Sequence, residues 1–277
     1  MTRKVAIIAG RGALPGFVAS ALDAAGTPRL VAEMEGFEST LTASEGAERF
    51  RLERLVPFLD RLVDLGVSHV TFAGAVHRPR LDPALLDPGT MQLLPRIMTA
   101  MQNGDDATLR EVIALFEEWG LTVVGVATLC PDLLPGPGVL SAREPGPQDR
   151  DDAARAAAIV AALGAADVGQ GCVVARRLCL AVEALPGTDA MLAHVAALRG
   201  ADGPWHGQRG GVFFKGAKPG QDRRIDLPAL GPDTLRRIHA AGLSGVAFEA
   251  GSVLVLDRAA TSALADELDL FLWAREP

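Results

Sequence analysis

Short, almost continuously apolar segments alternate with amphipathic ones along the first half of this chain. Segments of strand length occupy residues 5–9, 29–34, 67–73 and 121–127, and the stretches between them show helical spacing at 17–25, 54–65, 93–102 and 107–119. Strands that are apolar on both faces are typical of a parallel sheet covered by helices. We therefore predict the α/β class, with a doubly wound, Rossmann-like sheet over residues 1–130 that binds a nucleotide or a phosphate.

A proline-rich stretch separates this half of the chain from the next. Residues 131–150 contain five prolines, which is typical of a stiff linker at a domain boundary. Residues 151–277 then predict a mixed α/β domain, which we expect to be the catalytic one. Its expected strands lie at 171–174, 178–183, 212–215, 224–227, 245–249 and 253–257, and its helices at 150–163, 188–198, 232–241 and 258–268. The first two of these strands, separated by Arg176-Arg177, are expected to form a hairpin.

Charge and composition exclude some classes of function. The net charge is −7, whereas a general nucleic-acid binder needs a basic surface. Tyrosine is absent and aromatic residues make up 5% of the chain, which leaves little material for base stacking. Three scattered cysteines favour a reducing compartment, and no apolar run reaches the roughly 18 residues that span a bilayer. We therefore expect a cytoplasmic protein without a signal peptide.

The first candidate site is the loop after the first strand, Gly10-Arg11-Gly12-Ala13-Leu14-Pro15-Gly16. It lies between a strand and a helix, where backbone N–H groups and the helix dipole favour an anion. Pro15 stands in the place of the third glycine of the dinucleotide motif, and no P-loop Gly-Lys-Ser/Thr follows. Gly10, Gly12, Leu14 and Pro15 are candidates for contact with a substrate phosphate, and a simple tight turn explains them equally well.

Two further polar segments lie in loops beside the expected sheet. In Asn103-Gly104-Asp105-Asp106, one aspartate is expected to cap the following helix, and the pair is also a candidate for binding Mg²⁺ or a sugar hydroxyl. Arg78 follows the third strand, at the edge where a doubly wound sheet binds its ligand. It is a candidate for pairing with a phosphate, with a surface arginine as the alternative.

The densest candidate runs from Lys215 to Pro228. Four cations and two carboxylates fall within twelve residues, namely Lys215, Lys218, Arg223, Arg224, Asp222 and Asp226. If residues 222–226 are extended, Asp222, Arg224 and Asp226 share one face. Cations that neutralise phosphate, beside a carboxylate that holds a metal or a water, suit phosphoryl transfer. The alternative is a solvated loop whose charges pair with one another.

Other features weigh on the class of function. The histidines lack zinc spacing, and we expect Cys172 and Cys179 to be core residues. Gly10 and Gly12, followed by Glu33 or Glu35 about twenty residues on, leave a nicotinamide-dependent oxidoreductase as one alternative, although the third glycine and a hydride-transfer partner are lacking. A non-catalytic protein that binds a nucleotide or a lipid is the other alternative.

Taken together, the glycine and polar turns resemble one family. The chain is similar to the UDP-2,3-diacylglucosamine pyrophosphatases of lipid A biosynthesis, in the form unrelated to calcineurin-like phosphoesterases. The matching segments cover nearly the whole chain and are Gly10-x-Gly12-x-Leu14-Pro15, Phe72-Ala-Gly74 with Arg78-Pro79, Gly104-Asp105-Asp106, Asp167-x-Gly169-Gln170-Gly171, Glu183 with Gly187-Thr188-Asp189-Ala190-Met191, Lys215…Lys218-Pro219…Gln221…Arg224-x-Asp226-Leu227-Pro228…Gly231, and Glu249-Ala250-Gly251.

The resemblance implies a hydrolase dependent on Mg²⁺, with Mn²⁺ as a substitute, that cleaves UDP-2,3-diacylglucosamine to UMP and 2,3-diacylglucosamine 1-phosphate (lipid X). It implies two domains that hold the lipid between them, and a catalytic aspartate, matched by Asp226, that binds the metal or activates water. Lys215 and Arg224 are then expected to be catalytic, offsetting phosphoryl charge. The expected substrate contacts are Gly10, Gly12, Leu14, Pro15, Arg78, Asp105, Asp106, Gln170, Thr188, Asp189, Lys218 and Gln221.

The same resemblance sets the expected surroundings of the protein. A cytoplasmic enzyme of a Gram-negative-type envelope that acts on an acylated sugar is expected to touch the inner-membrane surface transiently. Nucleic acid is not an expected partner. A homodimer is expected only from the general frequency of such assemblies.

Overall fold

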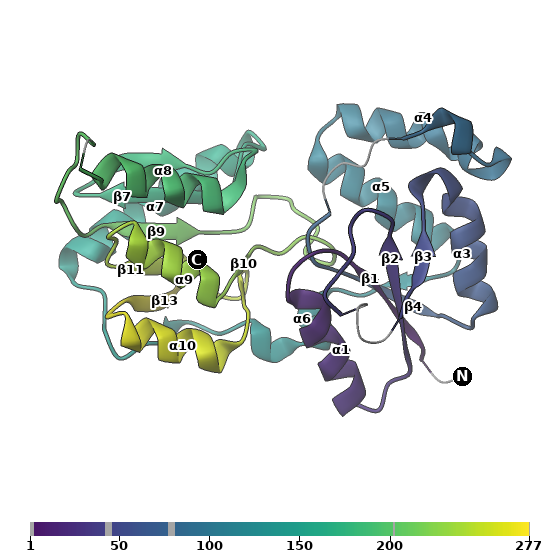
Figure 1. The fold of residues 1–277 in the computed structure, drawn as a ribbon, viewed down its shortest axis with the longest axis horizontal. Coiled ribbons are helices and arrows are strands. Elements are labelled where there is room, and N and C mark those ends of the chain that lie inside the picture. The colour runs from purple at the N-terminus through teal and green to yellow at the C-terminus, as the bar shows by residue number, and fades with distance from the viewer. Residues whose placement is uncertain (1–2, 42–45, 77–80, 202, 277) are drawn as a thin grey trace. The chain divides into compact units, whose positions relative to one another are not determined.

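A computed structural model describes residues 3–276 except 42–45, 77–80 and 202. The chain divides into two compact units (Figure 1). The N-terminal unit comprises the chain up to Pro131 together with Asp222–Asp226, and the C-terminal unit comprises Asp132–Gln221 and the chain from Leu227 onward. None of the helices in the described part of the chain combines the length and the hydropathy needed to cross a bilayer.

The N-terminal unit is built on a five-stranded sheet of order β3-β2-β1-β4-β5, in which every pair is parallel. Its strands are β1 (Val5–Ala9), β2 (Arg29–Met34), β3 (Glu48–Phe50), β4 (His69–Ala73) and β5 (Thr122–Val123). Every residue of β1 is buried, as expected for a central strand covered on both faces. The predicted parallel sheet is therefore confirmed.

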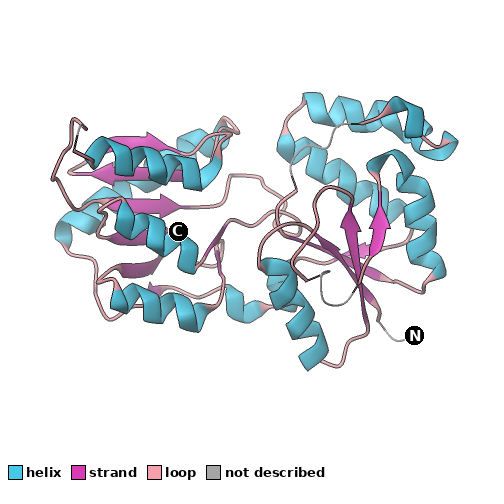
Figure 2. Cartoon of the chain, in the orientation of Figure 1, coloured by secondary structure: helices cyan, strands magenta, loops and turns pink. Residues whose placement is uncertain are grey.

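Helices lie on both faces of this sheet (Figure 2). They are α1 (Leu14–Ala24), α3 (Leu55–Asp64), α4 (Pro88–Gln102), α5 (Asp105–Glu118) and α6 (Val126–Leu129), with short 3₁₀ turns η1 (Leu52–Arg54) and η2 (Pro83–Leu85). Alternate sheet residues such as Ala6, Ile8 and Val70 pack with α3, α4 and α5 in one hydrophobic cluster. The doubly wound arrangement follows from this two-sided covering.

Several helix starts differ from the sequence-based expectation. Helix α1 begins at Leu14 instead of residue 17, because Pro15 fits the first turn of a helix, where its missing N–H costs nothing. Helix α4 begins at Pro88, since the Asp87 carboxylate caps the N–H groups of Gly89 and Thr90. The strand expected at 121–127 is only two residues long, and α6 follows it.

Two glycines allow the loops after β1 and β4 to meet. These strands are neighbours at the centre of the sheet, where the strand order reverses. Arg11 and Ala75 exchange backbone hydrogen bonds of 3.0 and 2.9 Å. A Cβ at Gly10 would lie 2.7 Å from the Ala75 carbonyl oxygen, and one at Gly74, whose φ is +97°, would lie 2.7 Å from the Arg11 carbonyl oxygen. Gly10 therefore serves the contact between the loops, because only a residue without a Cβ fits there.

The C-terminal unit has a six-stranded mixed sheet of order β6-β13-β11-β9-β7-β8. Strands β9 (Val212–Lys215), β11 (Gly245–Glu249) and β13 (Phe271–Arg275) are parallel, whereas β6 (Gly138–Val139) is antiparallel to β13. Strands β7 (Gly171–Ala175) and β8 (Leu178–Val182) form the predicted antiparallel hairpin, which is confirmed. A separate pair is made of β10 (Ala229–Leu230) and β12 (Leu254–Val255).

Helices cover both faces of this second sheet as well. Helices α8 (Gly187–Arg199), α9 (Pro232–Ala240) and α10 (Arg258–Glu267) pack on one face through Leu192, Leu235 and Ala265. Helix α7 (Pro147–Ala165) packs on the other through Ala153 and Ala156. The predicted mixed α/β class is confirmed.

Three expectations for this half of the chain are wrong. Residues 131–150 are not a linker, because they include the 3₁₀ turn η3 (Pro131–Leu133), the sheet strand β6 and the first turn of α7. Residues 224–227 are not a strand, since 222–226 form a turn. Cys172 is a core residue, as expected, but Cys179 is exposed because its strand lies at the edge of the sheet.

We predict that Gly10→Ala destabilises the protein and that Gly16→Ala does not. An added methyl group at Gly10 overlaps backbone, and such overpacking costs about 1–3 kcal/mol. Gly16 lies within α1 with open space around its Cβ position, so alanine there gains up to about 1 kcal/mol of helix propensity. Denaturant unfolding of both variants measures the difference, and equal midpoints would contradict the role assigned to Gly10.

Candidate active site

One edge of the C-terminal sheet gathers polar side chains. Strands β8, β9 and β11 run in the same direction and end there, so Glu183, Lys215 and Glu249 lie at the carboxyl ends of their strands. The antiparallel strand β7 starts at this edge, just after Gln170, whose carbonyl accepts a 3.1 Å hydrogen bond from Gly216 N–H. The carboxyl edge of parallel strands is where α/β proteins bind ligands.

Lys215 is the central cation of this edge. The residue is only 6% exposed, and its Nζ donates a 2.6 Å hydrogen bond to Thr188 Oγ1 and lies 3.8 Å from Glu183 Oε2. A buried ammonium of this kind persists because a carboxylate and a hydroxyl offset its lost hydration. Lys215, predicted to be catalytic, and Thr188, predicted to contact the substrate, are therefore brought together.

The residues around this edge include two buried side-chain oxygen atoms whose hydrogen-bonding capacity is not used. Within the described residues, Glu183 Oε2 and Gln170 Oε1 are buried without a hydrogen-bond partner. A Cβ at Gly171 would lie 2.4 Å from Glu183 Oε2, so the turn around Gln170 closes tightly on this carboxylate. Unpaired buried acceptors are costly, and donors on a ligand, such as sugar hydroxyl or amide groups, would satisfy them.

The loop after β9 holds Lys218 in the same unit. Lys218 Nζ pairs with Asp167 Oδ1 at 2.8 Å, and its backbone N–H donates to Gln221 Oε1 at 2.9 Å. Asp189, in contrast, pairs with Arg237 of α9 at 3.1 Å. Of the predicted contacts in this unit, Lys218 and Gln221 share one loop, whereas Asp189 has a partner on a neighbouring helix.

The turn at residues 222–226 belongs to the N-terminal unit. The Asp222 carbonyl accepts hydrogen bonds from the N–H groups of Ile225 and Asp226 at 3.2 and 3.3 Å, which excludes the extended chain expected here. Ile225 packs against the hydrophobic cluster of that unit. A Cβ at Gly125 would lie 3.1 Å from Arg224 Cα, so a glycine after β5 allows the turn to approach.

Arg224 fixes the conformation of this turn. Its guanidinium donates to Asp222 Oδ2 at 2.7 Å and to Glu117 Oε1 at 2.8 Å. The hydrogen bond from Arg224 lowers the pKa of the Asp222 carboxyl, and the same bond raises the pKa of Arg224. Both groups are therefore ionised, and the partly buried Asp226 is presented from a braced turn.

The charged segment from Lys215 to Asp226 is thus divided between the two units. Lys215, Lys218 and Gln221 belong to the C-terminal unit, whereas Arg224 and Asp226 belong to the N-terminal one. Sequence reasoning missed Glu117 and Gly125, which hold the turn, because nothing in the sequence relates them to a residue about a hundred positions away. The role of Glu183 was indicated only by its place in a family motif.

The other candidates of the N-terminal unit fall into three groups. Gly12, with φ of +100°, lies in the loop before α1, and Leu14 and Pro15 form the first turn of that helix. Asp105 and Asp106 open α5 instead of capping it, since the cap position is Gly104, and the side chain of Asp106 forms an ion pair with Arg110. Arg78 and the side chain of Asp105 lie outside the described part of the chain.

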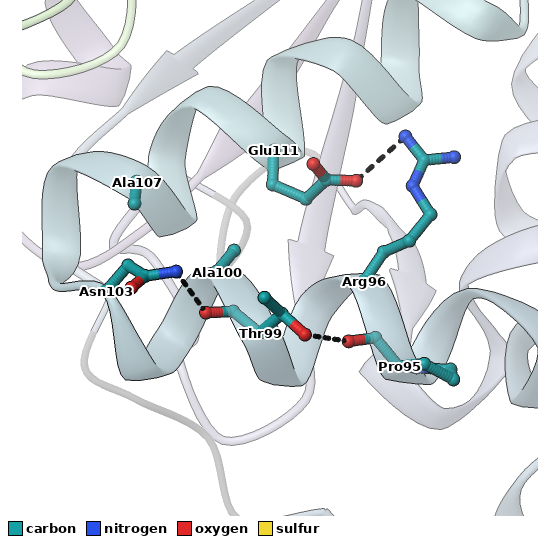
Figure 3. Close-up of a pocket in the computed structure, with 7 residues that line it drawn as sticks. All are labelled: Pro95, Arg96, Thr99, Ala100, Asn103, Ala107 and Glu111. Carbon is teal, nitrogen blue, oxygen red and sulfur yellow. Dashed lines mark hydrogen bonds and ion pairs between the residues drawn. The ribbon is translucent and has the colours of Figure 1, made fainter.

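A groove of about 500 Å³ lies between α4 and α5 (Figure 3). Its charged side chains are already paired, because Arg96 lies 2.8 Å from Glu111 and 2.7 Å from Glu118. Asn103 lines it and donates to the Thr99 carbonyl. The groove holds none of the predicted catalytic residues.

The donor set decides which kind of metal this chain suits. Among the residues that the structure describes, no three His, Cys, Asp or Glu side chains converge on one point. A metal held by protein ligands alone therefore does not fit these residues. Magnesium keeps several waters and needs only one or two carboxylates when a substrate phosphate completes its shell. The partly buried Asp226, the predicted metal ligand, would provide one such carboxylate, so the residues present are compatible with a magnesium ion of that kind.

Comparison with known proteins also finds two domains, with a boundary close to Pro131. The family model for the LpxI N-terminal domain matches residues 4–133, and that for the LpxI C-terminal domain matches residues 136–273. The chain belongs to the LpxI family. It is also 38% identical over 276 residues to the UDP-2,3-diacylglucosamine pyrophosphatase LpxI of Caulobacter vibrioides, a match that covers 99% of this chain and 98% of the relative.

Membership of the LpxI family confirms the resemblance inferred from the motifs. It does not by itself assign roles to residues, so the roles of Asp226, Lys215 and Arg224 stay predictions. The geometry supports them differently. Lys215 is paired with one carboxylate, Glu183, at 3.8 Å, whereas the charge of Arg224 is matched by two carboxylates at 2.8 and 2.7 Å. Arg224 is therefore better suited to positioning the turn than to binding a phosphate.

We predict that Lys215→Met is strongly destabilising because it leaves Glu183 buried without its cation. Breaking a buried ion pair from one side typically costs about 3–5 kcal/mol. Adding Glu183→Gln should recover much of that loss, since the uncompensated charge is then removed. Lys218→Met is the matched control, because its partner Asp167 is 40% exposed and such a pair contributes at most about 1 kcal/mol. Equal losses in the two lysine variants would contradict the assignment.

Proposed function

We propose that this chain hydrolyses the diphosphate of UDP-2,3-diacylglucosamine, releasing UMP and 2,3-diacylglucosamine 1-phosphate (lipid X) for lipid A biosynthesis. The observation that carries the proposal is the match to the Caulobacter vibrioides pyrophosphatase over 99% of the chain, together with both LpxI domain matches. This match favours a hydrolase over the nicotinamide-dependent oxidoreductase and the non-catalytic binding protein. Release of UMP from the purified protein tests the proposal directly.

The cations of the C-terminal unit suit a diphosphate substrate. A diphosphate resists hydrolysis because its negative charge repels a nucleophile, and fixed positive groups offset the charge that develops during attack. Lys215 and Lys218 are both held in place by carboxylates, at Glu183 and Asp167. Preorganised cations of this kind need little rearrangement when the substrate arrives.

Asp226 is the proposed catalytic carboxylate. The turn braced by Arg224 keeps its side chain partly buried and its backbone hydrogen-bonded to Asp222. A positioned carboxylate either accepts a proton from the attacking water or binds the metal that Mg²⁺-dependent hydrolysis requires. When bound, magnesium supplies charge neutralisation at the phosphoryl oxygens.

A diacylated substrate implies contact with a lipid surface. Two acyl chains keep the substrate and its product lipid X in a membrane, so we propose that the enzyme touches the inner-membrane surface from the cytoplasmic side during turnover. The homodimer stays a prediction without a structural argument.

We predict that Asp226→Asn lowers UMP release by about 10²–10⁴-fold, the usual contribution of a positioned acid or base. Binding of the substrate should be retained, because Arg224 holds the turn through its bonds to Asp222 and Glu117 and the substitution leaves these bonds in place. Asp233→Asn is the control, since Asp233 is also an aspartate near an arginine but is 92% exposed and pairs with Arg236 on the same helix. An Asp226→Asn variant with wild-type turnover would remove Asp226 from the mechanism.

Removal of divalent metal should stop turnover while leaving the fold intact. Because no closed protein cage for a metal is found among the described residues, we expect EDTA to abolish UMP release without changing the melting temperature. Added Mg²⁺ should restore the rate, and Mn²⁺ should substitute for it. Full turnover after EDTA treatment would exclude the metal role and leave Asp226 as a general base.

A further inference from the structure

The hairpin β7–β8 carries two cysteines that the proposed reaction does not use. Cys172 lies on β7 and Cys179 on β8, and their Sγ atoms are 3.7 Å apart. They are diagonal neighbours across a register shift between Val173 and Val174. A bulge of this kind increases the local twist of a strand pair, and here the two side chains come into contact on one face.

The two thiols differ in their access to solvent. Cys172 is fully buried beneath α7, whereas Cys179 is exposed on the edge strand. Burial raises the pKa of the Cys172 thiol, which therefore stays protonated. A solvent-borne oxidant thus meets Cys179 first, with a second thiol already in contact behind it.

The scaffold around the hairpin holds this arrangement in place. Arg176 and Arg177 both have positive φ in the turn, and their backbone N–H groups donate to the buried Asp152 carboxylate at 2.9 and 2.6 Å. Strand β7 lies between β9 and β8, whereas β8 is last in the strand order of the sheet. Strand β8 is thus better able to shift than β7.

We propose that Cys172 and Cys179 form an oxidisable dithiol that closes into a cross-strand disulfide when a peroxide reaches Cys179. The Cys179 thiolate attacks one peroxide oxygen and the O–O bond breaks, which gives a sulfenic acid and, after protonation, one water. The Cys172 sulfur then attacks Cys179 Sγ. The S–O bond breaks, and the departing hydroxide takes the Cys172 proton to form a second water. Two thiols are oxidised by two electrons, and the peroxide is reduced to two waters.

Closing the disulfide would shift strand β8 of the hairpin and the residue that follows it, Glu183. An S–S bond of about 2.05 Å requires the sulfur atoms to approach by roughly 1.7 Å from their present separation. Most of that movement falls on β8, and β8 leads directly into Glu183, whose N–H donates to the Gly171 carbonyl at 2.8 Å. Oxidation should therefore slow hydrogen exchange of the hairpin amides and change the protection of the Glu183 amide.

The test treats the folded, full-length protein with hydrogen peroxide, alkylates the remaining thiols, and digests it with trypsin. Two arginines lie between the cysteines, so trypsin separates Cys172 from Cys179 unless a disulfide joins the two peptides. We expect a linked peptide pair that dithiothreitol splits, with Cys130 still reduced. A sulfinic or sulfonic acid at Cys179 beside a reduced Cys172 would overturn the proposal, as would a disulfide between two chains or no reaction at all.

Variants separate the roles of the three cysteines. Cys172→Ala should lose the linked pair and allow Cys179 to oxidise further, because no resolving thiol remains. Cys179→Ser should leave Cys172 unreacted, and since position 179 is exposed this variant should fold normally. Cys130→Ser is the matched control in the other unit and should give the same linked pair as the wild type. Loss of the pair in Cys130→Ser would contradict the assignment.

Discussion

The pairing of Arg224 with Asp222 and Glu117 is the interaction on which the proposed site depends. It turns a charged stretch of sequence into a braced turn, and the partly buried Ile225 anchors that turn to the hydrophobic cluster of the N-terminal unit. Five residues from the middle of the C-terminal sequence thus become part of the other unit. Asp226 is positioned by this return of the chain and not by the strands on either side of it.

Lys215 and Lys218, in the same segment of sequence, are held in place by ion pairs within the C-terminal unit. Lys215 ends a central strand and is buried against Glu183 and Thr188, while Lys218 is tied to Asp167. Carboxylate partners keep these cations ordered, at the cost of part of their positive potential. Glu183 Oε2 and Gln170 Oε1, which are buried without a hydrogen-bond partner, add acceptors at the same edge. Such a mixture of donors and acceptors suits a sugar diphosphate better than an isolated phosphate.

The fold was largely predictable because its strands are short, apolar and regularly spaced. The parallel sheet around β1 and the β7–β8 hairpin follow from local patterns that tertiary contacts do not override. The wrong predictions of secondary structure concern segments rich in polar residues or proline, whose conformation depends on contacts with residues distant in sequence. The strand β6 lies in a proline-rich stretch because β13 provides its partner, and β13 itself was not expected beside the final helix.

The candidate site was predictable in its residue types but not in its partners. Lys215, Arg224 and Asp226 lie within twelve positions, so the sequence predicted one common site for them. The pattern of charges did not indicate that residues 222–226 belong to the N-terminal unit, whereas Lys215 belongs to the C-terminal unit. The sequence around Gly125 and Glu117 does not indicate that both hold the turn at residues 222–226. Each does so through its contact with Arg224, which is about a hundred positions away. The same limit applies to Gly10. Its motif suggested contact with a phosphate, but its missing Cβ is required by the carbonyl of Ala75, so a glycine motif at a sheet edge can reflect packing between loops as much as ligand binding.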